Sequence, residues 1–376
     1  MTHAPRTEDE IAALVASARA GGRRLSVEGG GTRAGLAART DADDTLTTRE
    51  MSGITLYDPN EMTITALAGT PVEEIEQALA AKGQMLPFEP VDPRALYATN
   101  GAPTLGGLVA AGFSGPRRVQ AGSLRDALLG ARFVNGFGEV VKSGGRVVKN
   151  VTGLDLARLQ VGAQGRFGVL TQVTFKLLPR PAARATLALE GLDDARAIEA
   201  LSAALATPYE VSGAAHDQRR RLTLLRLENN ADALAYRLDA LTARLAPYGA
   251  ARRLDADEAD ATWRDLRDLR AFADTGKPVW RLASAPSRAA ALVAAVARES
   301  GAGVDAIYDW GGGLAHLSGE IDADAMARAL GGAGHARLLR GAHAHAPAAT
   351  DPAAALKARL TKAFDPDGVF APAPVA

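Results

Sequence analysis

The sequence predicts an α+β protein with a large glycine-rich domain followed by a smaller cap domain. The chain has 376 residues, enough for two domains of about 150–200 residues each. Glycine residues are dense in the first half and become sparse after Pro179 and Pro181. We therefore expect a first domain over residues 1–180, a cap domain over 181–350, and a C-terminal helix and tail over 351–376 that return toward the first domain.

The first domain alternates helix and strand signals. A capping box that starts at Thr7 predicts a first helix, and a strand at 25–27 runs directly into a glycine run. Further strands are expected at 62–68, 132–134, 139–141 and 169–178, where apolar and β-branched residues cluster.

The second half has a different pattern, in which alanine-rich helices alternate with strands. The order strand, helix, strand, strand, helix, strand over 279–339 predicts a ferredoxin-like α+β unit. Strands at 186–189 and 222–227 and helices at 193–206 and 230–246 precede it. We expect this unit to form the core of the cap.

Composition excludes several classes of function. Lys plus Arg equals Asp plus Glu at 43 each, so the chain lacks the excess positive charge typical of nucleic-acid binding. The absence of cysteine excludes disulfides, thiolate metal sites and a cysteinyl flavin link. No apolar run approaches the ~18 residues of a membrane span, and the polar N-terminus is unlike a secretory signal. We expect a cytoplasmic protein, peripheral to a membrane only through partners.

Three glycine-rich segments carry the candidate chemistry. The first is the run at 29–33, directly after a strand, where consecutive N–H groups can bind an anion or form a flexible hairpin. The second, 104–126, can open onto a helix whose N-terminus faces a phosphate, and its Arg117 and Arg118 could screen phosphate charge or remain solvated. The third spans 144–171. None is a Walker loop or a Rossmann fingerprint, so several phosphate-type loops in one domain indicate a ligand with a diphosphate and two ends, such as FAD.

These motifs resemble the FAD-binding domain of the vanillyl-alcohol-oxidase (PCMH-type) superfamily over residues 5–180. Four elements, at 84–90, 115–118, 149–156 and 308–312, are similar to the GlcE-type FAD-binding subunits of glycolate oxidase and occur in the same order. The resemblance implies a PCMH-type domain of two α+β subdomains. It also implies that FAD is bound and that glycolate is oxidised to glyoxylate with flavin-mediated electron transfer, beside a larger homologous flavin subunit and an iron–sulfur subunit.

The resemblance also implies which residues bind the cofactor. Two segments would bind the diphosphate, a third group would follow the ribityl and ring side, and the last would frame the adenosine or the ring edge. The residues expected at the diphosphate are Gly29, Gly30, Gly31, Thr32, Arg33, Thr104, Leu105, Gly106 and Gly107. Those expected on the ribityl and ring side are Gly112, Gly122 and Ser123. Those expected at the adenosine or the ring edge are Asn150, Gly153, Asp155, Gly165, Gly168 and Val169. A flavin-linking His or Cys has no counterpart at 112–123, so FAD is expected to be noncovalent.

The cap departs from related 2-hydroxy-acid dehydrogenases, which carry a histidine- and aspartate-rich motif that binds a metal. The nearest segment here, 311–316, has one histidine and no aspartate, so no metal site is expected and the catalytic residues stay unknown. His316 is either a satisfied strand residue or a base for the substrate hydroxyl. These departures favour substrate oxidation mainly in the partner subunit. Two alternatives are a self-sufficient oxidoreductase for another small 2-hydroxy acid or alcohol, and a structural flavin-fold subunit without turnover.

Overall fold

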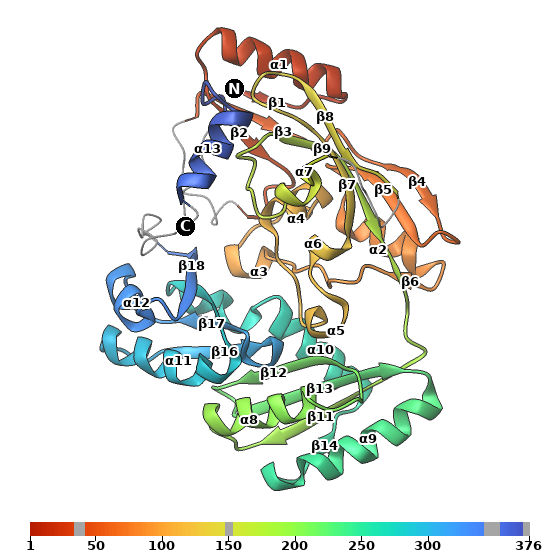
Figure 1. Ribbon diagram of the computed structural model, residues 1–376, viewed down its shortest axis with the longest axis vertical. Coiled ribbons are helices and arrows are strands. Elements are labelled where there is room, and N and C mark those ends of the chain that lie inside the picture. Colours follow the sequence, from red (N-terminus) through yellow and green to blue (C-terminus); the bar gives the residue numbers. More distant parts are fainter. Residues whose placement is uncertain (34–41, 147–152, 342–353, 371–376) are drawn as a thin grey trace.

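The computed structural model describes residues 1–33, 42–146, 153–341 and 354–370. Figure 1 shows two bodies stacked along the long axis of the molecule. The N-terminal body contains β1 to β10, and the second body, the cap, contains β11 to β18.

A small parallel sheet and one helix begin the N-terminal body. The three strands pair in the order β1 (Thr2–His3), β3 (Asp44–Thr47), β2 (Leu25–Glu28). Helix α1 (Glu8–Ala20) starts where the sequence predicts, because the Thr7 hydroxyl accepts the N–H of Glu10 at 3.2 Å. The apolar face of α1 packs on this sheet and forms the core of the first α+β subdomain.

A five-stranded antiparallel sheet forms the second subdomain. Its strands lie in the order β4 (Ile54–Asp58), β5 (Thr63–Leu67), β9 (Val169–Lys176), β7 (Leu128–Val134), β8 (Val140–Gly144). Its helices are α2 (Val72–Ala80), α3 (Arg94–Tyr97), α4 (Leu105–Ala111), α5 (Arg118–Ala121), α6 (Leu124–Ala127) and α7 (Leu156–Leu159). Strands β6 (Gln84–Met85) and β10 (Leu178–Pro179) pair as a separate ribbon.

The cap is one eight-stranded sheet made of two ferredoxin-like units. The first unit is β11 (Ala183–Glu190), α8 (Asp194–Leu205), β12 (Val211–Asp217), β13 (Leu222–Asn229), α9 (Ala231–Leu245) and β14 (Arg252–Arg253). The second is β15 (Val279–Ser284), α11 (Pro286–Ser300), β16 (Asp305–Asp309), β17 (Leu314–Ser318), α12 (Ala323–Leu330) and β18 (Gly334–Arg340). Antiparallel pairing of β12 with β16 joins the units edge to edge.

The sequence predicts the second unit but not the repeat of the same motif before it. The sequence did not predict strand β12, because its small residues, Gly213 to Ala215, have low β propensity. In the fold they make room for an aromatic ring, since a Cβ at Gly213 would lie 2.9 Å from the Trp263 ring. Tertiary packing, rather than local propensity, therefore makes this segment a strand.

Both faces of the cap sheet are buried, each by different partners. Helices α8, α9, α11 and α12 contribute to the hydrophobic core on one face. The other face packs against α10 (Ala256–Arg267), η2 (Arg270–Thr275) and residues of the N-terminal body that include Leu96 and Phe113. This second face places the cap strands β15 to β18 next to the N-terminal body.

The chain returns to the N-terminal body after the cap. Helix α13 (Ala354–Phe364) ends with the Phe364 ring 5.6 Å from Phe167 and 6.0 Å from Phe133. The backbone beyond it also joins β2, because the N–H of Leu25 donates to the Val369 carbonyl at 2.7 Å. We propose domain limits near residues 180 and 350 on this arrangement.

Candidate functional site

The first two glycine segments pack directly against each other. A Cβ added at Gly30 would overlap the Ala102 carbonyl, and one added at Gly29 would overlap the Thr104 hydroxyl. The approach is reciprocal, because a Cβ at Gly101 would overlap the Gly30 carbonyl. Only glycine permits this backbone contact between segments about seventy residues apart in the sequence.

The second segment is fixed to the end of β5. The N–H of Gly106 donates to the Ala68 carbonyl at 2.7 Å, and the N–H of Leu105 donates to the Thr70 carbonyl at 3.0 Å. The Thr104 hydroxyl accepts the N–H of Gly107 at 3.3 Å and caps α4. The first two segments are therefore held on one rigid strand end.

The third segment joins them through α4. The N–H of Gly162 donates to Val109 and that of Gln164 to Ala110, each at 3.0 Å. Gly112 ends α4 with φ +69°, and a Cβ there would lie 2.9 Å from the Gly162 nitrogen. Gly165 lies against Val27, the last residue but one of β2. Three segments from different parts of the sequence thus meet at one place.

Other residues expected at the cofactor stabilise the backbone close to them. Gly122 and Ser123 form a turn in which the Ser123 N–H and hydroxyl both donate to Asp126, at 2.8 and 2.7 Å. The Asp155 carboxylate caps α7 by accepting the N–H of Arg158 at 3.1 Å. Their role in cofactor binding stays a prediction.

The remaining expected residues are placed as follows. Gly168 packs against the backbone of β7, and Val169 is fully buried in the core with α1. Gly153 adopts φ +76° with open space around its Cβ position, and Asn150 lies outside the described residues. Thr32 is buried, and its carbonyl accepts the Thr99 hydroxyl at 3.1 Å. Thr32 belongs to the first segment, and Gly153, Gly168 and Val169 belong to the third. The part that these residues take in cofactor binding stays a prediction.

Arg33 supplies the positive charge at the meeting point. Its Nη1 lies 3.8 Å from the position of a Cβ at Gly107, and its buried Nε has no hydrogen-bond partner among the described residues. Burial lowers the pKa of Arg33 to about 10, although Tyr97 and Asp92 oppose the shift. The Arg33 Nη2 donates to the Val91 carbonyl at 3.3 Å, so Nε is the part of the guanidinium left without a partner. A cradle of close-packed glycines beside this buried cation fits a cofactor that carries a diphosphate.

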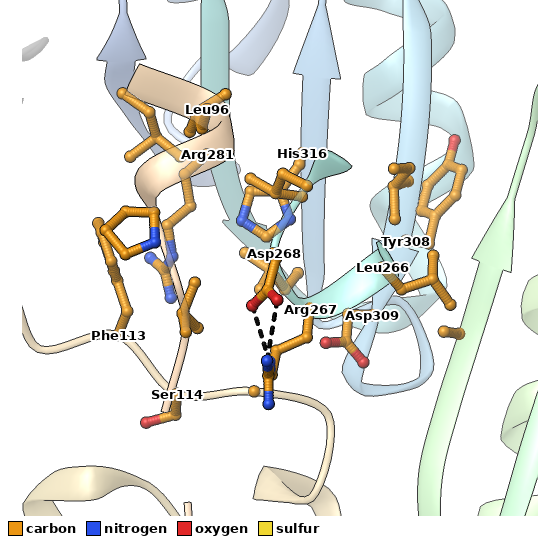
Figure 2. A pocket seen from close by; sticks show the side chains of 18 of the residues that line it. Leu96, Phe113, Ser114, Leu266, Arg267, Asp268, Arg281, Tyr308, Asp309 and His316 are labelled. Carbon is orange, nitrogen blue, oxygen red and sulfur yellow. Dashed lines mark hydrogen bonds and ion pairs between the residues drawn. The ribbon is translucent and has the colours of Figure 1, made fainter. Parts of the chain in front are cut away.

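A pocket that is partly open to solvent lies between the two bodies. Phe113 and Ser114 line it from the N-terminal body, and Arg281, Asp309 and His316 line it from cap strands β15, β16 and β17 (Figure 2). The part of the second glycine segment that follows α4 therefore faces the cap across this pocket.

The pocket combines the cation Arg281 with two groups, His316 and Asp309, whose pKa values are shifted from their ordinary values. Burial and the neighbouring Arg281 lower the pKa of His316 to about 3, so its imidazole is neutral at pH 7. Burial and the nearby Glu89 carboxylate raise the pKa of Asp309 to about 7, against the N–H of Trp310 that donates to it at 2.7 Å. The Arg281 side chain makes no hydrogen bond or ion pair with the described residues, and its guanidinium lies 5.3 Å from the Trp310 ring centroid. Such a set can hold a carboxylate and exchange a proton.

Four buried charges join the two bodies beside the pocket, and the sequence did not indicate them. Arg226 of the cap donates to both oxygens of Glu89 at 2.8 and 2.9 Å. Arg117 donates to both oxygens of Glu228 at 3.1 and 2.7 Å. All four side chains are between 5% and 15% exposed. Arg117, considered for phosphate or solvent, is instead an interface residue. The one local signal was Glu89 between two prolines in an apolar run.

Trp310 fixes the cap at the same place. Its indole N–H donates to the Gly115 carbonyl at 3.1 Å, and the Arg118 guanidinium stacks on its ring at 4.1 Å from the centroid. Trp310 and Glu89 adopt left-handed backbone conformations, with φ +55° and +47°, which are uncommon for residues with side chains. The fold holds both in place because both join the two bodies.

No cluster of three or more His, Asp or Glu side chains that could bind a metal occurs among the described residues. In the same part of the chain, no helix is long and apolar enough to span a membrane.

Comparisons with known proteins identify the family of the N-terminal domain and related full-length chains. The model of the FAD binding domain family matches residues 1–144. Glycolate oxidase subunit GlcE of Escherichia coli is 35% identical over 357 residues, which cover 93% of this chain and 91% of that protein. Glycolate oxidase subunit GlcD of Bacillus subtilis is 30% identical over 185 residues, which cover 49% of this chain and 38% of that protein.

A solved structure extends the similarity to the whole fold. The 4-ethylphenol oxidase of Gulosibacter chungangensis superposes with a TM-score of 0.75 at 14% identity, covering 99% of this chain and 88% of the other. The expected α+β fold with a PCMH-type FAD-binding domain is confirmed, and FAD is the cofactor of this domain.

The contact between the first two segments gives a direct test of the cradle. We expect Gly30→Ala to abolish or strongly weaken FAD binding, because the new methyl overlaps the Ala102 carbonyl and forces the segments apart. The measurement is the flavin-to-protein absorbance ratio after purification and reconstitution. Gly303→Ala, in the cap, is the matched control, since nothing lies within 4 Å of its Cβ position. Equal flavin content in both variants would contradict the role of this contact.

The buried ion pairs predict acid sensitivity. Although burial opposes ionisation, Arg226 and Arg117 hold the pKa of Glu89 at about 2, below its ordinary value of about 4.5. The stability that this carboxylate contributes is therefore complete above pH ~4.5 and is lost as the pH falls toward 2. We expect Glu89→Gln to lower the free energy of unfolding by about 3–5 kcal/mol at pH 7, because it leaves two buried guanidinium groups without this partner.

Urea unfolding of wild type and Glu89→Gln at several pH values measures this difference, which should narrow between about pH 5 and pH 3. Arg252→Gln, which breaks two exposed ion pairs on the cap, with Glu190 and Glu258, should cost less than about 1 kcal/mol at every pH. A Glu89→Gln effect as small as that of Arg252→Gln would show that the buried pairs do not stabilise the interface.

Proposed function

The chain belongs to the GlcE-type family of glycolate oxidase subunits, and we propose that it is the FAD-binding subunit of a complex that oxidises glycolate to glyoxylate. The observation that carries the proposal is the 35% identity to the Escherichia coli subunit over almost the full length of both chains. The convergence of three glycine segments beside Arg33 supports it, because such a cradle suits a diphosphate. The chain has no cysteine and no histidine between residues 4 and 215, which supports noncovalent FAD.

The proposed partners are a larger homologous flavin subunit and an iron–sulfur subunit. Similarity of about half of the chain to a GlcD-type subunit supports a complex that contains two related flavoproteins. In that complex this chain contributes a second flavin site and passes electrons onward. We propose a cytoplasmic location, with any membrane association made through partners.

Oxidation of a 2-hydroxy acid removes two electrons and two protons, and bound FAD supplies the two-electron acceptor. The chain must then hold the acid and accept the hydroxyl proton. Arg281 is placed to bind the carboxylate, because it is half-buried in the pocket and makes no ion pair with the described residues. Asp309, with a pKa near 7, is ionised in part at neutral pH and can accept the proton.

This pocket supports a second candidate function, a self-sufficient oxidoreductase for a small 2-hydroxy acid. The sequence favoured chemistry in the partner because the cap lacks the metal-binding motif. Arg281, Asp309 and His316 give the cap a different set of groups on three adjacent strands. A cation and a proton acceptor in one pocket are the minimum that the reaction requires of the protein. The fit of the glycine cradle disfavours the third alternative, a structural subunit without flavin.

Anaerobic reduction of the flavin by glycolate, with and without the partner subunits, separates the two candidates. If this chain only relays electrons, glycolate reduces its flavin in the complex but not in the isolated chain. If its own pocket works, the isolated chain is reduced, and Arg281→Gln should raise the glycolate concentration for half-maximal rate about 10- to 100-fold by removing a charge-assisted contact. An isolated chain that binds no FAD would contradict both.

A further inference from the structure

Three cationic or ionisable side chains form a row across the cap sheet. In the antiparallel register His316 of β17 lies opposite Arg281 of β15, and Arg281 lies opposite Arg337 of β18. Directly opposed residues share a face of the sheet. This is the face toward the N-terminal body, since the Arg337 guanidinium lies 5.9 Å from the Phe113 ring centroid.

The end of the row at Arg337 lacks the partners that a buried charge requires. Its buried Nε has no hydrogen-bond partner among the described residues, and neither has the Tyr97 hydroxyl. The buried Nε of Arg33, from the first glycine segment, also lacks a partner among the described residues, although its Nη2 donates to the Val91 carbonyl at 3.3 Å. Burial raises the pKa of Tyr97, and the charges of Arg337 and Arg33 both oppose this rise, so both arginines lie near its hydroxyl. Arg166 of the third segment adds a further positive charge near Arg337.

Other arginines in this interface, unlike Arg337, have a full set of hydrogen-bond or ion-pair partners. Arg340, three residues further along β18, donates to the carbonyls of Leu96, Phe272 and Ala273 at 2.7–3.0 Å. Arg226 is paired with Glu89 in the same interface. A buried cation without such partners is costly, and like charges that face each other across a domain interface add repulsion. An anion bound between the two bodies removes both costs.

We propose that Arg337 of the cap and Arg33 of the N-terminal body form a two-sided clamp for the diphosphate of the cofactor, so that cofactor binding and seating of the cap are coupled. The inference rests on the proposed FAD-binding role of the chain. A diphosphate suits the site because it carries two negative charges and Arg33 lies against the Gly107 backbone of the glycine cradle. The cap is then part of the cofactor site and not only a cover for the substrate.

Binding of three ligands to the full chain tests the clamp. FAD and ADP contain the diphosphate, and riboflavin does not. We expect Arg337→Gln to weaken FAD and ADP about 10- to 100-fold, the effect of losing one or two charge-assisted hydrogen bonds, while riboflavin binding stays unchanged. Titration calorimetry measures ADP, and flavin fluorescence measures the other two. Arg328→Gln, an exposed change on α12, is the matched control and should alter none of them.

The outcomes separate the clamp from the proposed function. Unchanged ADP and FAD affinity in Arg337→Gln would overturn the clamp, and so would an equal loss for riboflavin, which would place the residue beside the ring. Failure of the wild-type chain to bind FAD would instead overturn the proposed function. If Arg337→Gln does not fold, Arg337→Met keeps the apolar stem over Phe113 and is measured in the same way.

The coupling has its own readout. In the wild-type chain ADP alone should slow amide hydrogen exchange in η2 and β18, which lie where the cap meets the N-terminal body. In Arg337→Gln, at ADP concentrations that give equal occupancy, this protection should be lost. Equal protection in both proteins would overturn the coupling.

Discussion

The ion pairs between Glu89, Arg117, Arg226 and Glu228 set the position of the cap, and the rest of the cleft depends on that position. Two of these pairs, Arg226–Glu89 and Arg117–Glu228, each join a side chain of the N-terminal body to one of the cap through two hydrogen bonds. The other two, Arg117–Glu89 and Arg226–Glu228, lie within one body. Because the charges are buried, any displacement of the cap would leave them desolvated and unpaired, at a cost of several kcal/mol. The pairs therefore define one relative arrangement of the bodies, in which β15 to β18 face the second glycine segment.

The same interface divides into a paired half and an unpaired half. At Glu89 each positive charge has a carboxylate partner, whereas Arg33, Arg281 and Arg337 have no carboxylate partner in the described part of the chain. The paired half is complete in the protein alone, and the unpaired half is chemically complete only with anionic ligands. One interface can thus fix the geometry of the domains and still provide binding energy for a diphosphate at one end and a carboxylate at the other.

Local sequence signals predicted much of the fold and the loops of the site. The capping box at Thr7 and the strand that runs into Gly29 can be predicted from the sequence, because each depends on residues only a few positions apart. Strand β12 was missed because its alanines and Gly213 become a strand only when packed beside Trp263. The site was harder to predict, since Arg117 pairs with Glu228 across 111 positions and no local pattern reveals such a partner. The row of His316, Arg281 and Arg337 could not be predicted either, because it depends on how three strands align with one another in the sheet.

An experimental structure of the FAD-bound chain tests the central claim most directly. The account predicts that the diphosphate lies within hydrogen-bond distance of main-chain N–H groups at 29–33 and 104–107, with the flavin ring directed to the pocket lined by Phe113 and Asp309. A diphosphate bound elsewhere, or a cap rotated so that Arg226 no longer reaches Glu89, would contradict it.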